Sequence, residues 1–152
     1  MNIHPLHTVI CTDKVARTVN FYEDFFGYSP VFEREDHVIL RRNGVRESEL
    51  AVVGVDHVSI PDGFRNVTTG LMLNFYVEDL EESFEHFYYE GLDIASEMSD
   101  APCGEKYFIL RDPNNNLITI MKKEHRERNS EDPANIEIPF EAICTAPQHK
   151  IA

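Results

Sequence analysis

The feature that most constrains this chain is a strand-like run that leads directly into a helix cap, and it occurs twice. Leu71–Asp79 reads Leu-Met-Leu-Asn-Phe-Tyr-Val-Glu-Asp. Such an apolar run is typical of a buried β-strand, and Asp79 is well placed to cap a following helix. The run from His7 to Asp13 opens the chain in the same way. We therefore interpret the chain as one small unit written twice, with low identity between the copies.

The first copy predicts a strand, a helix and three further strands. Thr8–Thr12 is apolar and β-branched, and Thr12 or Asp13 is expected to cap the helix by accepting a bond from its free N–H groups. Gly27 is a natural end for that helix. The apolar face of the helix is formed by Val15, Val19, Tyr22 and Phe26. The three strands are expected at Val31–Glu35, His37–Arg41 and Leu50–Val53.

The second copy predicts the same order after a linker over 56–70, where proline and glycine are frequent and periodicity is weak. Gly91 is expected to end its helix, and Asp112-Pro-Asn-Asn-Asn is a turn in which asparagine tolerates left-handed geometry. The inward stripe of the helix is formed by Leu80, Phe84, Phe87 and Tyr88. The strands are expected at Leu71–Val77, Ile94–Met98, Tyr107–Arg111 and Leu117–Met121.

Composition narrows the classes of function. The formal net charge is −13, so the surface repels nucleic-acid phosphates and anionic lipid, and neither partner is expected. No apolar run is long enough to span a bilayer, and the N-terminus lacks the pattern of a secretory signal. The three cysteines, at Cys11, Cys103 and Cys144, form no disulfide framework. We therefore expect a cytoplasmic protein.

Two such units imply a pocket. A four-stranded sheet with one helix buries one face only, so two modules side by side can curve into a cup whose inner wall is lined by strand residues. The expected fold class is α+β, with paired βαβββ modules that form a curved mixed sheet with a cup-shaped pocket. We expect one domain over 1–123, divided into a first module at about 5–55, a linker at 56–70 and a second module at 71–123. The polar stretch 124–152 is expected to be an extension.

Four motifs, in order, resemble those of the vicinal oxygen chelate superfamily, which includes glyoxalase I, bleomycin-resistance proteins and extradiol dioxygenases. Phe21-Tyr-Glu-Asp-Phe-Phe-Gly-Tyr resembles the family's helix end, and Phe75-Tyr-Val-Glu-Asp resembles the start of its second module. Pro102-Cys-Gly-Glu-Lys-Tyr-Phe resembles a glycine-containing approach to the last turn. Asp112-Pro-Asn-Asn-Asn-Leu-Ile-Thr-Ile resembles the closing motif. The resemblance covers His7 to Met121 and implies paired βαβββ modules, often assembled as a homodimer.

The resemblance also implies where a metal would bind, because family members take one ligand from each of four strands. The first position falls on His7, fourteen residues before Phe21, and the second on Glu49. The third falls on Met72 and the fourth on Thr119, and neither side chain is a good ligand for the divalent metals of such sites. Without a metal, His7 would be a hydrogen-bonded strand histidine, Met72 core packing, and Thr119 an ordinary strand residue. His57 is a further candidate ligand in the linker.

Two functions follow from this incomplete ligand set. The first is a glyoxalase- or bleomycin-resistance-like protein that binds a small organic molecule in the cup without a complete metal site. The second is a lyase or dioxygenase that depends on a divalent metal held by His7, Glu49 and an unforeseen third ligand. The catalytic residues of such an enzyme are unknown. The residues expected to line the pocket are His7, Glu49, Met72, Asn74 and Thr119.

Two alternatives stand beside these functions. Cys103 could act as a nucleophile, although its acidic neighbourhood would raise the pKa of its thiol. The chain could also be a structural or interaction protein whose cup is filled by its own side chains.

Overall fold

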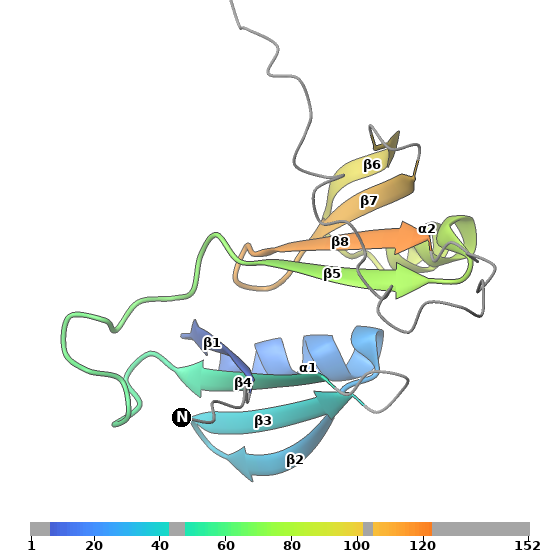
Figure 1. Cartoon of the computed structure of the whole chain (residues 1–152). Coiled ribbons are helices and arrows are strands. Elements are labelled where there is room, and N and C mark those ends of the chain that lie inside the picture. The colour runs from blue at the N-terminus through green and yellow to red at the C-terminus, as the bar shows by residue number, and fades with distance from the viewer. Residues whose placement is uncertain (1–6, 43–47, 102–104, 123–152) are drawn as a thin grey trace, which may run out of the picture. The chain divides into compact units, whose positions relative to one another are not determined.

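The computed structural model describes residues 7–42, 48–101 and 105–122. These residues form two βαβββ modules, as predicted (Figure 1). The elements of the first module are β1 (Thr8–Thr12), α1 (Val15–Phe26), β2 (Ser29–Arg34), β3 (His37–Arg42) and β4 (Ser48–Gly54). The elements of the second are β5 (Met72–Val77), α2 (Leu80–Tyr89), β6 (Ile94–Asp100), β7 (Lys106–Arg111) and β8 (Leu117–Lys122).

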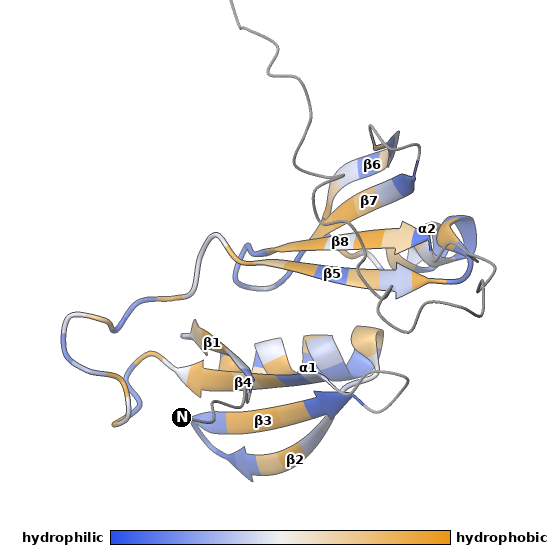
Figure 2. Cartoon of the chain, in the orientation of Figure 1, coloured by the Kyte–Doolittle hydropathy of each residue, from blue (hydrophilic) through white to orange (hydrophobic). Residues whose placement is uncertain are grey.

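The first sheet has the strand order β1-β4-β3-β2, with β1 parallel to β4 and the remaining pairs antiparallel. Side chains alternate between its two faces, and the face toward α1 forms the core. Ile10, Leu40 and Val52 on that face are completely buried. Figure 2 shows the apolar colour running through β3 and β4.

The helix α1 begins differently from the prediction. Lys14 occupies the N-cap position, and its side chain makes no capping hydrogen bond to the first turn. The Thr12 hydroxyl instead accepts a hydrogen bond from the backbone N–H of Lys14, and it also takes part in a distant contact described below. The end of the helix is as predicted: Gly27 has φ of 66°, the left-handed conformation that glycine adopts most easily. Val19, Tyr22 and Phe26 are buried, as the apolar face requires.

The second sheet has the strand order β5-β8-β7-β6. The arrows of β5 and β8 run in the same direction (Figure 1), whereas β6 and β7 are antiparallel, so this sheet is mixed as well. Asp79 caps α2 as predicted, because its Oδ1 accepts a bond of 2.9 Å from the N–H of Glu82. The predicted inward stripe of α2 is wrong for Tyr88, which is 63% exposed and stacks on the ring of Phe84 at the helix surface.

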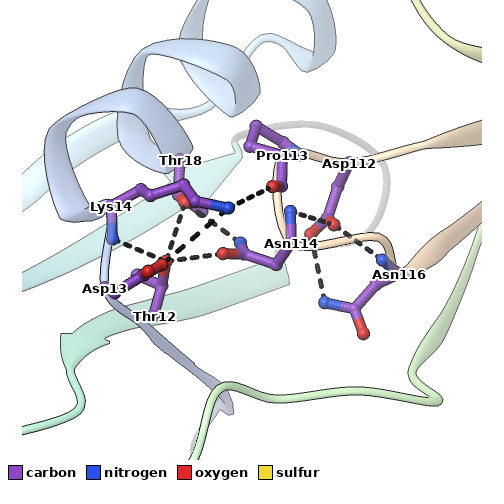
Figure 3. A network of polar contacts seen from close by, with 8 residues as sticks. All are labelled: Thr12, Asp13, Lys14, Thr18, Asp112, Pro113, Asn114 and Asn116. Atoms are coloured by element: carbon purple, nitrogen blue, oxygen red, sulfur yellow. Dashed lines mark hydrogen bonds and ion pairs between the residues drawn. The ribbon is translucent and has the colours of Figure 1, made fainter.

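The turn after β7 is attached to the first module by buried polar contacts (Figure 3). Residues 111–117 belong to one compact unit with the described residues up to Leu71, and the other described residues form a second unit. Asn115 in this turn has φ of 64°, as the Asp-Pro-Asn-Asn-Asn motif predicts. The Thr12 hydroxyl donates to Oδ1 of Asn114, and the Asn114 amide donates to Oγ1 of Thr18 at 3.0 Å.

Asp112 is the centre of this turn and is only 5% exposed. Its carboxylate accepts four hydrogen bonds. Oδ1 accepts from the backbone N–H groups of Asn114 and Asn116, both at 2.8 Å. Oδ2 accepts from the Asn116 amide at 3.2 Å and from the Tyr22 hydroxyl at 3.1 Å. The motif that marks a local turn in the sequence is therefore also a long-range connection to α1.

The linker has more structure than its sequence suggests. Ile60 is 9% exposed and packs against Ala51 and Val53 on the face of the first sheet opposite α1. Farther along, Thr68 binds the edge of β1 twice: its N–H donates to the Cys11 carbonyl at 2.8 Å, and its hydroxyl accepts from the Cys11 N–H at 2.9 Å. The linker therefore covers part of a sheet face and part of a sheet edge.

The expected α+β fold class and paired βαβββ modules are confirmed, and each module holds its own open, four-stranded mixed sheet. The cup between the modules stays a prediction. Among the described residues, no helix combines the length and hydropathy that a membrane crossing requires. Residues 124–152, where the polar extension was expected, and Cys103 lie outside the described residues.

Candidate functional site

The face of the first sheet opposite α1 carries the polar side chains that the sequence singles out, and we call it the open face. The strand register arranges it in three rows. Arg41 pairs with Glu49, and His7 contacts Glu49 from the other side. The middle row places Val9, Ala51 and Ile39 side by side, and the third row places Cys11, Val53 and His37 side by side. The open face therefore has an apolar middle with a charged row at one end.

The charged row is held together by Glu49, whose side chain is 17% exposed. Its Oε1 accepts from Arg41 twice, from Nε at 2.8 Å and from Nη2 at 2.6 Å. Its Oε2 lies 3.6 Å from Nδ1 of His7. The Arg41 hydrogen bond and charge, with a smaller contribution from His7, lower the pKa of Glu49 below its ordinary value, so the carboxylate is ionised at neutral pH.

The opposite end of the open face is aromatic. The His37 ring lies 5.3 Å from the Phe32 ring and 5.3 Å from the His57 ring, measured between centroids. Partial burial lowers the pKa of His37, and the neighbouring rings of His57 and His7 lower it further. His57 comes from the linker, and its Nδ1 accepts from the Ser59 N–H at 3.1 Å. The His37 ring is therefore in surroundings that favour its neutral form.

The donor set on the open face does not fit a four-ligand metal site. Over residues 7–42, 48–101 and 105–122, no three His, Cys, Asp or Glu side chains are grouped so that they could hold an ion. His7 and Glu49 are brought together as the resemblance implies, but one oxygen of Glu49 is already bound by Arg41. His57 is not a third ligand beside them, because it packs against His37 and bonds to Ser59.

His7 itself differs from the interpretation of a hydrogen-bonded strand histidine. Its Nδ1 is buried and has no hydrogen-bond partner in the described part of the chain. The nearest acceptor is the Glu49 carboxylate, and the distance of 3.6 Å is too long for a good hydrogen bond. The atom therefore remains a potential donor or ligand that faces Glu49.

The remaining predicted pocket residues lie in the second unit. Met72 and Asn74 are on β5 and Thr119 is on β8. Met72 is 50% exposed, so the interpretation as core packing is wrong, whereas Thr119 is a buried strand residue as expected. Whether these three side chains share a pocket with His7 and Glu49 stays a prediction, because each unit is described by itself.

The prediction from sequence did not include two residues of the open face, Arg41 and Ile60. Arg41 lies at the end of a strand where His37, Ile39 and Arg41 alternate onto one face, and this alternation was the available signal. Its pairing with Glu49 depends on the register of β3 with β4, which the sequence does not specify. Ile60 lies in a stretch without periodicity, so no signal marked it as part of the core.

Comparisons with known proteins agree with this architecture. The sequence model described as Glyoxalase/Bleomycin resistance protein/Dioxygenase superfamily matches residues 4–120. Among solved structures, a lactoylglutathione lyase from Agrobacterium tumefaciens is 18% identical, with a TM-score of 0.61 over 78% of this chain and 92% of that chain. A protein from the mobile metagenome of V. Pseudocholerae is 25% identical, with a TM-score of 0.62 over 82% and 98%.

A third structure, of a member of the Glyoxalase/bleomycin resistance protein/dioxygenase superfamily from Sphaerobacter thermophilus DSM 20745, is 17% identical, with a TM-score of 0.63 over 80% and 98%. The comparison with curated protein sequences gives no match. At such identities the similarity to the lyase and to the Sphaerobacter protein concerns the fold alone.

Proposed function

Because the chain belongs to the Glyoxalase/Bleomycin resistance protein/Dioxygenase superfamily, we propose that it binds a small organic molecule on the open face of its first sheet, without a complete metal site. The observation that carries this proposal is the engagement of Glu49 by Arg41. A carboxylate with a guanidinium on one oxygen is a hydrogen-bonding group already balanced in charge, rather than a free ligand for an ion.

The surface around Glu49 supports a ligand with an apolar body and a polar end. Val9 is 46% exposed in the middle row, although Ile10, the next residue of β1, faces α1 and is completely buried. The Arg41 side chain is 43% exposed in the adjacent row. An aromatic or aliphatic body on Val9 and Ile39, with a polar group at Arg41 or His7, would use both rows, as small-molecule sites commonly do.

Binding can be tested by NMR with benzamide, benzoate and 1-anilinonaphthalene-8-sulfonate as probes. We expect at least one probe to shift the resonances of Val9, Ile39 and Ala51. The variant V9E should abolish those shifts by placing a carboxylate in the apolar row. V31E is the matched control, because Val31 is 50% exposed on the edge strand β2. If no probe perturbs these three residues, or if V9E binds as well as the original protein, the open face is not the binding site.

A second candidate function is a lyase or dioxygenase that depends on a divalent metal bound by His7 and Glu49. The unpartnered Nδ1 of His7, 3.6 Å from Glu49, favours it, because an ion shared by the two groups would satisfy that atom. This function predicts tightly bound, stoichiometric metal in the purified protein and its complete loss in H7A. Elemental analysis of both proteins separates the two functions, and we expect less than one tenth of an ion per chain.

The proposal includes a homodimer, as the resemblance implies, located in the cytoplasm, as the cysteine pattern predicts. Light scattering coupled to size-exclusion chromatography tests the assembly, with a mass of twice 17.6 kDa as the expected result. A monomer at micromolar concentration would contradict this part of the proposal alone.

A further inference from the structure

Arg41 is the residue of the charged row whose role the fold does not explain. Its Nε and Nη2 both donate to Oε1 of Glu49, at 2.8 and 2.6 Å. Its side chain is 43% exposed, so the guanidinium lies at the surface of the row while the carboxylate lies beneath it, at 17% exposure. A bond pair this short, with a partly buried carboxylate, holds Glu49 in one orientation.

We propose that Arg41 prevents the His7–Glu49 pair on this face from binding a divalent metal ion. A metal ion bound to Glu49 would lie within roughly 5 Å of the positively charged guanidinium of Arg41. The guanidinium repels the ion and also occupies one of the two oxygens that the ion would use. The pair of donors implied by the resemblance is therefore present but blocked.

Removal of the guanidinium should expose a site that the rest of the row already forms. Glu49 would lose its cation while remaining mostly buried, which favours the uptake of another cation. His7 supplies a nitrogen 3.6 Å from the free oxygen, and that atom has no hydrogen bond to give up. An imidazole and a carboxylate are ligands that Zn²⁺ and Mn²⁺ both accept, with water completing the shell.

The test uses the full chain with R41M, and Zn²⁺ and Mn²⁺ alone as probes. Calorimetry measures the affinity for Zn²⁺, and the broadening of amide signals by Mn²⁺ locates the ion. R42M is the matched control, because it removes the same charge from the next residue of β3. Arg42 belongs to the other face: its Nε is 3.8 Å from the point where a side chain at Gly27 would begin.

We expect R41M to bind Zn²⁺ at least about tenfold more tightly than the original protein, since one repelling charge at this distance contributes on that order. We also expect Mn²⁺ to broaden the signals of His7 and Glu49 in R41M alone. The gain should disappear in R41M/E49Q and should be absent in R42M. R41Q, which loses the charge but keeps a polar side chain, serves as the second variant should R41M fail to fold.

Equal affinities for the original protein and R41M, or an equal gain in R42M, would overturn the role of Arg41. The inference rests on the proposed function only in that both take Glu49 to be engaged rather than free. The two fail separately. Stoichiometric metal in the original protein that E49Q retains refutes metal-free binding but leaves the Arg41 comparison intact. A failed Arg41 comparison leaves the probe binding at Val9 intact.

Discussion

The perturbation with the largest expected effect on folding is D112N. Asn114 and Asn116 donate backbone N–H groups to one oxygen of Asp112, and Asn116 and Tyr22 donate side-chain groups to the other. An asparagine at this position replaces one oxygen with an NH₂ group, which only donates. Whichever way the amide turns, two of the four donors then face another donor.

The size of the effect follows from this count. A hydrogen bond to a charged group contributes about 1.5–3 kcal/mol, and a buried donor left without a partner costs a similar amount. Two lost bonds at a residue that is 5% exposed therefore predict a decrease of about 3–5 kcal/mol in the free energy of unfolding. For a chain of this length, that decrease corresponds to a fall of about 10 °C in the melting temperature.

Urea denaturation followed by circular dichroism measures this difference, with Y22F as the comparison. Y22F removes one donor and leaves Oδ2 of Asp112 bonded to the Asn116 amide, so it should cost only about 1 kcal/mol. Burial and the neighbouring carboxylate raise the pKa of Tyr22, so its hydroxyl remains a donor throughout the pH range of the experiment. A loss in D112N no larger than that in Y22F would refute the reasoning, because the turn would then be held by its local geometry.

Three further predictions concern other parts of the structure. Burial and nearby rings lower the pKa of His37, so the folded state takes up a proton at this residue less readily than the unfolded state. The contribution of His37 to the free energy of unfolding is therefore full above pH 6.5 and is lost as the pH falls through the pKa of the folded state. H37F should flatten the decrease in urea midpoint between pH 7.5 and 5.5, and an unchanged slope would contradict this assignment. I60A should lower the free energy of unfolding by about 2 kcal/mol and accelerate proteolysis of the linker, because Ile60 packs on Ala51 and Val53; resistance equal to that of the original protein would show that the packing is dispensable. D79A should cost about 1 kcal/mol by removing the cap of α2, measurable in the same denaturation assay, and a neutral effect would show that Glu82 finds another acceptor.

Local signals in the sequence were sufficient for the elements of this fold. Apolar runs mark the strands, Gly27 marks the end of α1, and Asp79 marks the start of α2, because each of these features acts within a few residues of itself. The prediction for the start of α1 was wrong because the Thr12 hydroxyl accepts its bond from the Lys14 N–H, ahead of the first helical turn, and it also donates to Asn114, a distant contact that leaves no local trace in the sequence.

The candidate site was predictable in part. His7 and Glu49 were identified through the family resemblance, and the structure places Nδ1 of His7 3.6 Å from Oε2 of Glu49, whereas their role in a pocket stays a prediction. Arg41 was missed because its importance arises only once β3 and β4 are in register, and a shift by one residue would place it on the opposite face. The unpartnered Nδ1 of His7 and the packing of Ile60 on the sheet likewise arise from tertiary contacts, and residue spacing in the sequence does not predict such contacts.

The attachment of the 111–117 turn to α1 has a consequence for how this protein could be divided. A fragment that ends at residue 71 would contain every strand of the first sheet and yet leave the hydroxyls of Tyr22 and Thr12 without their acceptors. Dividing the chain between the two modules would therefore remove buried hydrogen bonds from the first one, and we expect that fragment to be less stable than the same residues in the whole protein. In a chimaera of two related proteins, residues 7–54 and the 111–117 turn should therefore come from the same parent. The segment from β5 to the end of α2 can come from the other parent.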